Sequence, residues 1–194
     1  TSFCKWTEPV SFENLPVGLQ EKIDPTDAYV KKLFFDRFLK LMLNAVYSQR
    51  ASLRDIQASL LNPDFQAAIG LESLSSSQIS RKIRGIDSAI LEEIFYFLVA
   101  LANQNKRNDK LPKAFIVDST TVSLNKNRYP WAEFRSTKSG IKLHLRLAYI
   151  VKVDAYPDKA VLTNASVHDV NKLEIVVDEK LATYLFDRGY MDFE

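Results

Sequence analysis

The stretch KAFIVDSTTVSL, residues 113–124, places a single carboxylate inside an apolar and β-branched run. Because β-branched residues fit the pleated surface of a sheet, the run predicts a strand over residues 114–124. A charge at the centre of a buried strand is costly unless it is paired or neutralised. Asp118 is therefore predicted to face a hydrogen-bond partner, a cation, or solvent at the end of a sheet.

Three further strands and one helix are predicted after this strand. The strands cover residues 141–151, 159–165 and 183–186, and the helix covers residues 169–180 with Ser166 as its cap. Three strands joined by short links indicate a meander, and the helix carries the chain across to a further, parallel strand. The order strand, strand, strand, helix, strand therefore predicts a mixed sheet.

A second carboxylate, Asp187, directly follows the last predicted strand, and Gly189 allows a sharp exit from it. That strand can lie beside the one that carries Asp118, so both carboxylates would converge at one edge of the sheet. Two acids so close repel each other unless a divalent cation lies between them. Sites of phosphoryl transfer use two metal ions ~3.5 to 4 Å apart in this way. From the spacing alone, each aspartate is equally explained as a strand-end or cap residue bonded to backbone amides.

Composition limits the kinds of metal site that the chain can build. Among 194 residues there is one cysteine, Cys4, and there are two histidines, His144 and His168. An internal disulfide, a cysteine-based zinc site and a histidine-rich site are therefore excluded. Any metal would be held by carboxylates, which favours Mg²⁺ or Mn²⁺.

The sequence shows no membrane or export signal. The longest apolar run, residues 89–102, is broken by Glu92 and Glu93, and no run approaches the ~20 residues of a membrane span. The chain begins with neither Met nor a basic-then-apolar pattern. We therefore expect a cytoplasmic protein without a membrane partner, and a sequence that is a piece of a longer product.

The N-terminal part divides into an irregular arm and a helical domain. Residues 1–26 contain Pro9, Pro16, Gly18 and Pro25 and predict a loosely packed arm. Residues 27–110 predict a helical domain, with helices over 28–47, 52–61, 63–70, 76–85 and 88–105. In the first of these, the residues that share one face at helical spacing are Val30, Leu33, Phe34, Phe38, Leu41 and Ala45.

Two of these helices suggest a DNA-reading layout. SLRDIQASLL followed by SSSQISRKIR resembles a helix-turn-helix, with Ile79 and Ile83 on the inner face of the second helix. The residues exposed on that helix would be Gln78, Ser80, Arg81 and Arg84. The link between the helices is too long for the tight version, and a plain helical bundle is the alternative.

Basic residues are concentrated in the middle of the sheet region. From Lys126 to Lys152 there are seven lysines and arginines, among them Arg135 and Lys138, against Glu133 alone. Such a run is commonly a solvated face, but next to a pair of acids it suggests a polyanionic partner. In the same region Trp131 either stacks on a base or anchors its loop.

Four segments in order carry a family resemblance: IVDSTTVSL, YPWAEFRSTKSGIKLHL, TNASVHDVNKLE and FDRGYMDFE. They resemble the catalytic-core segments of bacterial insertion-sequence transposases of the DDE class, whose second acid lies in an Asp-Arg-Gly-Tyr motif. The resemblance covers about residues 113–194. It implies an α+β protein in which the helical domain precedes the first part of a ribonuclease H-like core, residues 111–194.

The resemblance also implies roles for single residues. Asp118 and Asp187 match the first and second catalytic acids, which would hold two Mg²⁺ or Mn²⁺ ions. Arg188 and Tyr190 fall on the motif and would contact DNA phosphates. Lys142 and His144 lie on the same side of their strand, which is equally explained as a solvated face. With Arg135, Lys138, Arg81 and Arg84 they complete the predicted DNA-binding residues. Asp169 is better explained as a first-turn acid of the predicted helix than as a ligand.

The function implied by the resemblance is DNA transposition. Metal-dependent cleavage at the ends of an insertion sequence would free a 3′-hydroxyl that attacks target DNA, so the partner is double-stranded DNA, with a possible homodimer assembled on it at the nucleoid. The third acid of this class, a Glu in a Tyr-x2-Arg-x3-Glu pattern, is absent from the 194 residues. We therefore expect the chain to be inactive alone.

Two alternative functions belong to other classes of protein. The first is a non-catalytic DNA-binding fragment or regulator of transposition, which keeps recognition without cleavage. The second is phosphotransfer through an aspartyl nucleophile in a dehalogenase-like fold. That fold requires a second Asp two residues after the first, where this chain has Thr120, and alternating helices and strands instead of a meander.

Overall fold

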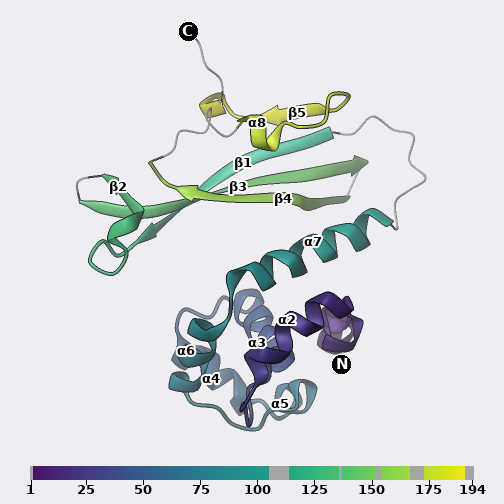
Figure 1. Cartoon of the computed structure of the whole chain (residues 1–194), viewed down its shortest axis with the longest axis vertical. Coiled ribbons are helices and arrows are strands. Elements are labelled where there is room, and N and C mark those ends of the chain that lie inside the picture. The colour runs from purple at the N-terminus through teal and green to yellow at the C-terminus, as the bar shows by residue number, and fades with distance from the viewer. Residues whose placement is uncertain (1, 105–113, 136, 152–153, 167–172, 191–194) are drawn as a thin grey trace. The chain divides into compact units, whose positions relative to one another are not determined.

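A computed structural model of the chain describes residues 2–104, 114–135, 137–151, 154–166 and 173–190. It divides into two compact units, Thr1–Leu98 and Val99–Glu194. The described residues form eight α-helices and one five-stranded mixed sheet (Figure 1). The predicted α+β class, with helices first and the sheet second, is confirmed. No helix among these residues is long and apolar enough to cross a membrane.

The first unit is helical throughout. Its α-helices are α1 (Ser2–Thr7), α2 (Val17–Asp27), α3 (Phe35–Tyr47), α4 (Leu53–Ala58), α5 (Pro63–Ile69), α6 (Ser76–Gly85) and α7 (Ser88–Gln104), whose last residues belong to the second unit. Three 3₁₀ turns lie between them: η1 (Glu8–Val10), η2 (Phe12–Asn14) and η3 (Ser59–Leu61).

The N-terminal segment is not an irregular arm. It contains α1 and α2, and Leu15, Leu19 and Ile23 are buried in a cluster with Phe35 of α3 and Ile90 of α7. The prolines mark the ends of short helices: Pro16 precedes α2, and Pro25 lies within its last turn. The prediction was wrong because these prolines end or begin helical turns that are long enough to bury apolar side chains.

The helix predicted over residues 28–47 begins only at Phe35. Tyr29 has a positive φ of 63°, which breaks the helical path. The Asp27 carboxylate accepts the Phe35 backbone N–H at 2.8 Å and also pairs with the ammonium of Lys82. Lys82 is consequently buried while Ile83, predicted to face inward, is 41% exposed. An ion pair between distant segments thus sets the start of α3 and the facing of α6.

The ends of α4, α5 and α6 follow the sequence signals. Ser52 accepts the Asp55 N–H at the start of α4. Gly70, with φ of 65°, ends α5 in the left-handed conformation. Ser75 and Gln78 form a capping box at the start of α6. The predicted helix boundaries near residues 52, 70 and 76 are therefore confirmed, because capping depends on local sequence.

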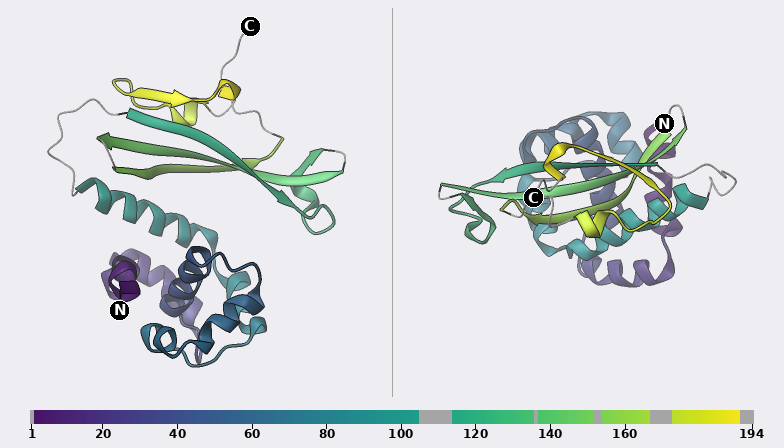
Figure 2. Two further views of the ribbon diagram at one scale, coloured as in Figure 1. Left: turned by 180° about the vertical axis from the view of Figure 1, so that it is seen from behind. Right: turned by 90° about the horizontal axis from the view of Figure 1, so that it is seen from above.

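The sheet forms the centre of the second unit. Its strands are β1 (Ala114–Leu124), β2 (Glu133–Arg135), β3 (Lys138–Val151), β4 (Asp154–Asn164) and β5 (Thr183–Phe186). The remaining elements are η4 (Pro130–Ala132), α8 (Leu173–Val176) and η6 (Arg188–Tyr190). β3 pairs antiparallel with both β1 and β4, and β5 pairs parallel with β1. The two views in Figure 2 show that β5 is short and follows only part of β1.

The meander and the parallel return are confirmed, but two boundaries differ. β3 and β4 extend beyond the predicted strands into a longer hairpin, and β2 was not predicted. The helix predicted over residues 169–180 ends at Val176, and its predicted start lies outside the described residues, as do His168 and Asp169.

Arg146 explains why α8 ends where it does. The guanidinium of this buried residue binds both carboxylate oxygens of Asp158, at 2.9 and 2.8 Å. It also donates to the Val176 carbonyl at 2.8 Å and to Asp178, and it lies 4.3 Å from the ring centroid of Phe115. One side chain of β3 therefore joins β1, β4 and the end of α8.

The carboxylate of Asp158 reaches Arg146 because β4 is irregular at this point. Arg146 pairs with Lys159 and Leu147 with Pro157, so Asp158 is an extra residue in the ladder. Such a bulge re-aims a side chain that would otherwise point to the other face of the sheet. The side chains of Asp158 and Lys159 therefore both lie on the face of the sheet that carries Arg146. On that face Lys159 pairs with Asp178.

Replacing Arg146 by Ala should destabilise the second unit by about 3–5 kcal/mol, because the carboxylate of Asp158 would remain buried without its partner. Urea unfolding followed by hydrogen exchange of β1, β3 and β4 measures the effect. Arg128→Ala, at an exposed position of the same unit, should change stability by less than about 0.5 kcal/mol. Equal effects of the two changes would show that the Arg146 contacts are not stabilising.

The second unit should also lose stability in acid. Partial burial acts to raise the pKa of Asp178, but hydrogen bonds from Lys159 and Arg146 outweigh it and lower the pKa from 3.8 to about 2. The stabilisation is therefore complete above pH 3.8 and is lost as the pH falls toward 2. Urea midpoints across this range should fall more steeply for the native chain than for Asp178→Asn.

Candidate functional site: a carboxylate pair at the end of two parallel strands

The two predicted acids occupy neighbouring positions at one end of the β1–β5 pair. The last paired residues of these strands are Val117 and Phe186, and Asp118 and Asp187 are the next residue on each chain. Adjacent strands lie about 4.8 Å apart, so the backbone brings the two aspartates close together. The predicted side-by-side placement of the two strands is confirmed.

Both aspartates are exposed, which answers how a charge is tolerated in β1. One oxygen of Asp118 accepts the backbone N–H of Ser119 at 2.8 Å. In the strand, Asp118 alternates with the buried Val117, so it points to the face that carries Ile116. The cross-strand partner of Asp118 on β3 is Leu145. The acid therefore lies at the solvent edge of an otherwise apolar face.

Tyr190 fixes the turn that follows Asp187. Its side chain is 1% exposed and packs with Val117 of β1 and Val176 of α8. Its ring lies 6.0 Å from that of Phe186, and its N–H donates to the Asp187 carbonyl at 3.3 Å. The turn η6 is thus attached to the covered face of the sheet, and Asp187 is held at the point where the chain leaves β5.

His144 completes this attachment from the neighbouring strand β3. It is fully buried, with one ring nitrogen 3.4 Å from the Tyr190 hydroxyl and the other 3.0 Å from the Thr163 hydroxyl of β4. His144 and Tyr190 were predicted to contact DNA, but in the structure they bind each other inside the unit. That prediction is corrected because α8 and η6 cover the face on which His144 lies. The link through Thr163 was not predicted, since no sequence signal marks it.

The remaining predicted DNA contacts are distributed over both units. Arg188 is exposed in η6, directly after Asp187. Lys138 is exposed at the start of β3, and Lys142 is half-buried on the same face as His144, opposite to the face of Asp118. Arg135 ends β2. Arg81 and Arg84 are exposed on α6 of the helical unit.

In the basic stretch from Lys126 to Lys152, fewer basic side chains are exposed and unpaired than the sequence suggests. Arg146 is buried in the ion pairs with Asp158 and Asp178, and Lys126 pairs with Glu133 at 3.1 Å. Lys152 lies outside the described residues. The Trp131 side chain is 68% exposed, so the ring does not serve as a buried anchor of its loop.

The donor set of the carboxylate pair suits a hard divalent cation. Oxygen ligands are those that Mg²⁺ prefers, and Mg²⁺ is commonly bound through one or two carboxylates with water in the remaining positions. Within the described ranges, no group of three or more His, Cys, Asp and Glu side chains is arranged to hold a metal. Asp118 and Asp187 would each supply carboxylate oxygens, which are ligands of this kind.

Comparison with known proteins supports the predicted resemblance over part of the chain. The chain is 35% identical over 78 residues to the probable transposase for insertion sequence element IS5377 of Geobacillus stearothermophilus. The match covers 39% of this chain and 21% of that protein, so the chain spans about a fifth of the relative's length. No family profile and no solved structure matches the chain. The chain is thus similar to an insertion-sequence transposase over this segment.

Two substitutions at Tyr190 should distinguish the contribution of its ring to stability from that of its hydroxyl. Tyr190→Ala removes a buried ring and should cost about 3–5 kcal/mol, with faster hydrogen exchange over residues 183–190. Tyr190→Phe keeps the ring and should cost less, about 1–3 kcal/mol, because the lost hydroxyl is a partner of the buried His144. If both variants exchanged like the native chain, the turn would be held by other contacts.

Proposed function

We propose that this chain is part of a DNA transposase and that Asp118 and Asp187 are two of its catalytic acids. The observation that carries the proposal is the β1–β5 register, which puts the two acids at adjacent positions on neighbouring parallel strands. If the two aspartates were only strand-end or cap residues, nothing would require them to occupy adjacent positions. The similarity to a probable transposase supplies the reaction class.

The strand order supports a ribonuclease H-like core. β4, β3 and β1 form an antiparallel meander, and α8 precedes β5, which returns parallel to β1 on its other side. This is the order that the family resemblance implies. The proposed acids lie on neighbouring strands of this order: Asp118 lies within β1, directly after its last pair with β5, and Asp187 directly follows β5.

Asp118 and Asp187 would hold Mg²⁺ or Mn²⁺, with two ions in the complete site. When bound, such ions supply the positive charge that stabilises the attacking and leaving oxygens of a displacement at phosphorus. The chain contributes the fixed placement of the carboxylates: β1 holds the first, and the Tyr190 anchor holds the second. Placement of this kind contributes to rate because it removes the need to order the ligands during the reaction.

Double-stranded DNA, at element ends and at the target, is the proposed substrate. Arg188 is exposed next to Asp187, and its guanidinium can bind a phosphate through two parallel hydrogen bonds. Lys138 would add charge at the start of β3. The proposal includes a third acid and assigns it to no residue of this chain, so cleavage and strand transfer belong to the complete site.

Iron-directed cleavage of the polypeptide tests the proposed metal site without requiring DNA cleavage. Fe²⁺ bound at a Mg²⁺ site reduces added hydrogen peroxide to hydroxide and a hydroxyl radical, and ascorbate returns the iron to Fe²⁺. The radicals cut the nearby backbone, so we expect fragments ending near residues 118 and 187. Excess Mg²⁺ should suppress the cuts, and Asp118→Asn should weaken both cuts together because the ligands share one ion. Asp64→Asn, at an exposed position in the helical unit, is the matched control.

Two outcomes would contradict the metal site. Cuts that persist in Asp118→Asn would place the ion elsewhere, and the absence of cuts near both residues would leave the aspartates as strand-end residues. In the second case, duplex DNA binding that survives would favour the alternative of a non-catalytic DNA-binding fragment or regulator.

A further inference from the structure

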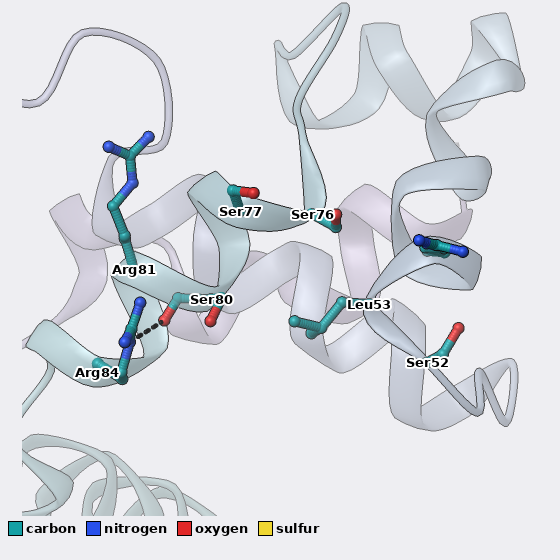
Figure 3. Close-up of a pocket in the computed structure, with 8 residues that line it drawn as sticks. Ser52, Leu53, Ser76, Ser77, Ser80, Arg81 and Arg84 are labelled. Carbon is teal, nitrogen blue, oxygen red and sulfur yellow. Dashed lines mark hydrogen bonds between the residues drawn. The ribbon is translucent and has the colours of Figure 1, made fainter.

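The helical unit contains a basic depression between α4 and α6. Its volume is about 660 Å³, and it is lined by Ser52, Leu53, Arg54, Ser76, Ser77, Ser80, Arg81 and Arg84. Figure 3 shows Ser52 and Leu53 on one wall and Ser77, Ser80, Arg81 and Arg84 on the other. Three arginines and four serines therefore face one hollow, and no carboxylate lines it.

The walls of the depression are fixed by the fold. The Gln57 side chain on α4 accepts the Ser76 N–H at the start of α6, at 3.1 Å. Below the surface, Ile56 and Ile79 are buried in the same apolar cluster. Because the helices are joined by a hydrogen bond and a shared core, the arginines project from a preformed surface.

The neighbouring acid, Asp55, is engaged within α4. Asp55 accepts the Ser52 hydroxyl at 2.8 Å, as part of the cap of α4. Arg84 is oriented by a hydrogen bond from its Nε to the Ser80 carbonyl at 3.4 Å. Arg54, Arg81 and Arg84 are all exposed, so their guanidinium groups can reach a ligand in solvent.

The chemistry of this lining suits phosphate oxygens more than base edges. Guanidinium groups bind phosphate through paired hydrogen bonds, and serine hydroxyls commonly contact the DNA backbone. The amide side chains that read adenine are engaged nearby: the carbonyl oxygen of Gln57 binds Ser76, and that of Gln78 binds the Ser75 N–H at 2.8 Å. Gln78, predicted to be exposed on the second helix, is thus part of a helix cap.

We propose that this depression binds the phosphate backbone of duplex DNA, with little preference for sequence. The inference rests on the proposed function for its ligand, but it uses none of the residues of the carboxylate pair. It gives the helical unit the role of holding DNA by its backbone, in place of the base-reading helix-turn-helix that the sequence suggested. Contacts of this kind set position and affinity without carrying sequence information.

The test is fluorescence anisotropy of the whole chain with two labelled 20-base-pair duplexes of different sequence, in EDTA and at several salt concentrations. Arg54→Ala/Arg81→Ala/Arg84→Ala should bind both duplexes about tenfold or more weakly. The slope of log affinity against log salt should fall by about 2–3, since each lost phosphate contact removes about 0.9. Lys5→Ala/Lys31→Ala/Lys32→Ala removes equal charge from exposed positions of the same unit and should have a smaller effect.

A second variant shows whether a loss of binding comes from the lost contacts or from unfolding of the protein. Arg81→Lys/Arg84→Lys keeps both charges but not the paired hydrogen bonds, so it should lie between the native chain and the triple alanine variant in affinity. Equal affinities of the Arg54→Ala/Arg81→Ala/Arg84→Ala variant and the Lys5→Ala/Lys31→Ala/Lys32→Ala variant would overturn the proposal. A loss of affinity confined to one of the two duplexes would also overturn it. Because EDTA removes divalent ions, either result leaves the iron-cleavage test of Asp118 and Asp187 unaffected.

Discussion

The second unit depends on one buried cation. Arg146 projects from β3 onto the covered face of the sheet, where it binds Asp158 of β4, the last carbonyl of α8 and Asp178, against the ring of Phe115. A buried charge is tolerated only when its hydrogen-bonding capacity is used, and here the donors of the guanidinium meet two carboxylates and a carbonyl. The end of α8 is thereby fixed, and the chain is directed into β5.

The candidate site follows from this placement. β5 lies parallel to β1 over only four residue pairs, and the two acids come immediately after the last pair. A short strand needs a further attachment to keep its end in place, and Tyr190 supplies it by packing on Val117 and Val176. The polar residues His144 and Arg146 are therefore buried inside the unit, while Asp118 and Asp187 remain exposed.

The helical unit uses an ion pair in a similar way. Asp27 binds the first N–H of α3 and the ammonium of Lys82 on α6, so the end of α2, the start of α3 and the distant helix α6 are joined. This contact turns Lys82 inward and leaves Arg81 and Arg84 on the outer surface with Arg54. The basic depression is therefore a consequence of how α6 is rotated against the rest of the unit.

The sequence by itself determined the features that depend on neighbouring residues. Capping at Ser52 and Ser75, the end of α5 at Gly70, the strand over residues 114–124 and the order of the sheet were all predictable, because caps, turns and alternation act over a few positions. The adjacency of β1 and β5, which brings Asp118 and Asp187 together, followed from that order.

Only the tertiary structure decided which polar side chains turn inward. Alternation placed Lys142, His144 and Arg146 on one face of β3 but did not state that α8 and Tyr190 cover it. The bulge at Asp158 and the pairing of Asp27 with Lys82 join residues 12 and 55 positions away from their partners along the chain. Such contacts depend on the packing of whole elements, and local sequence patterns carry no record of them.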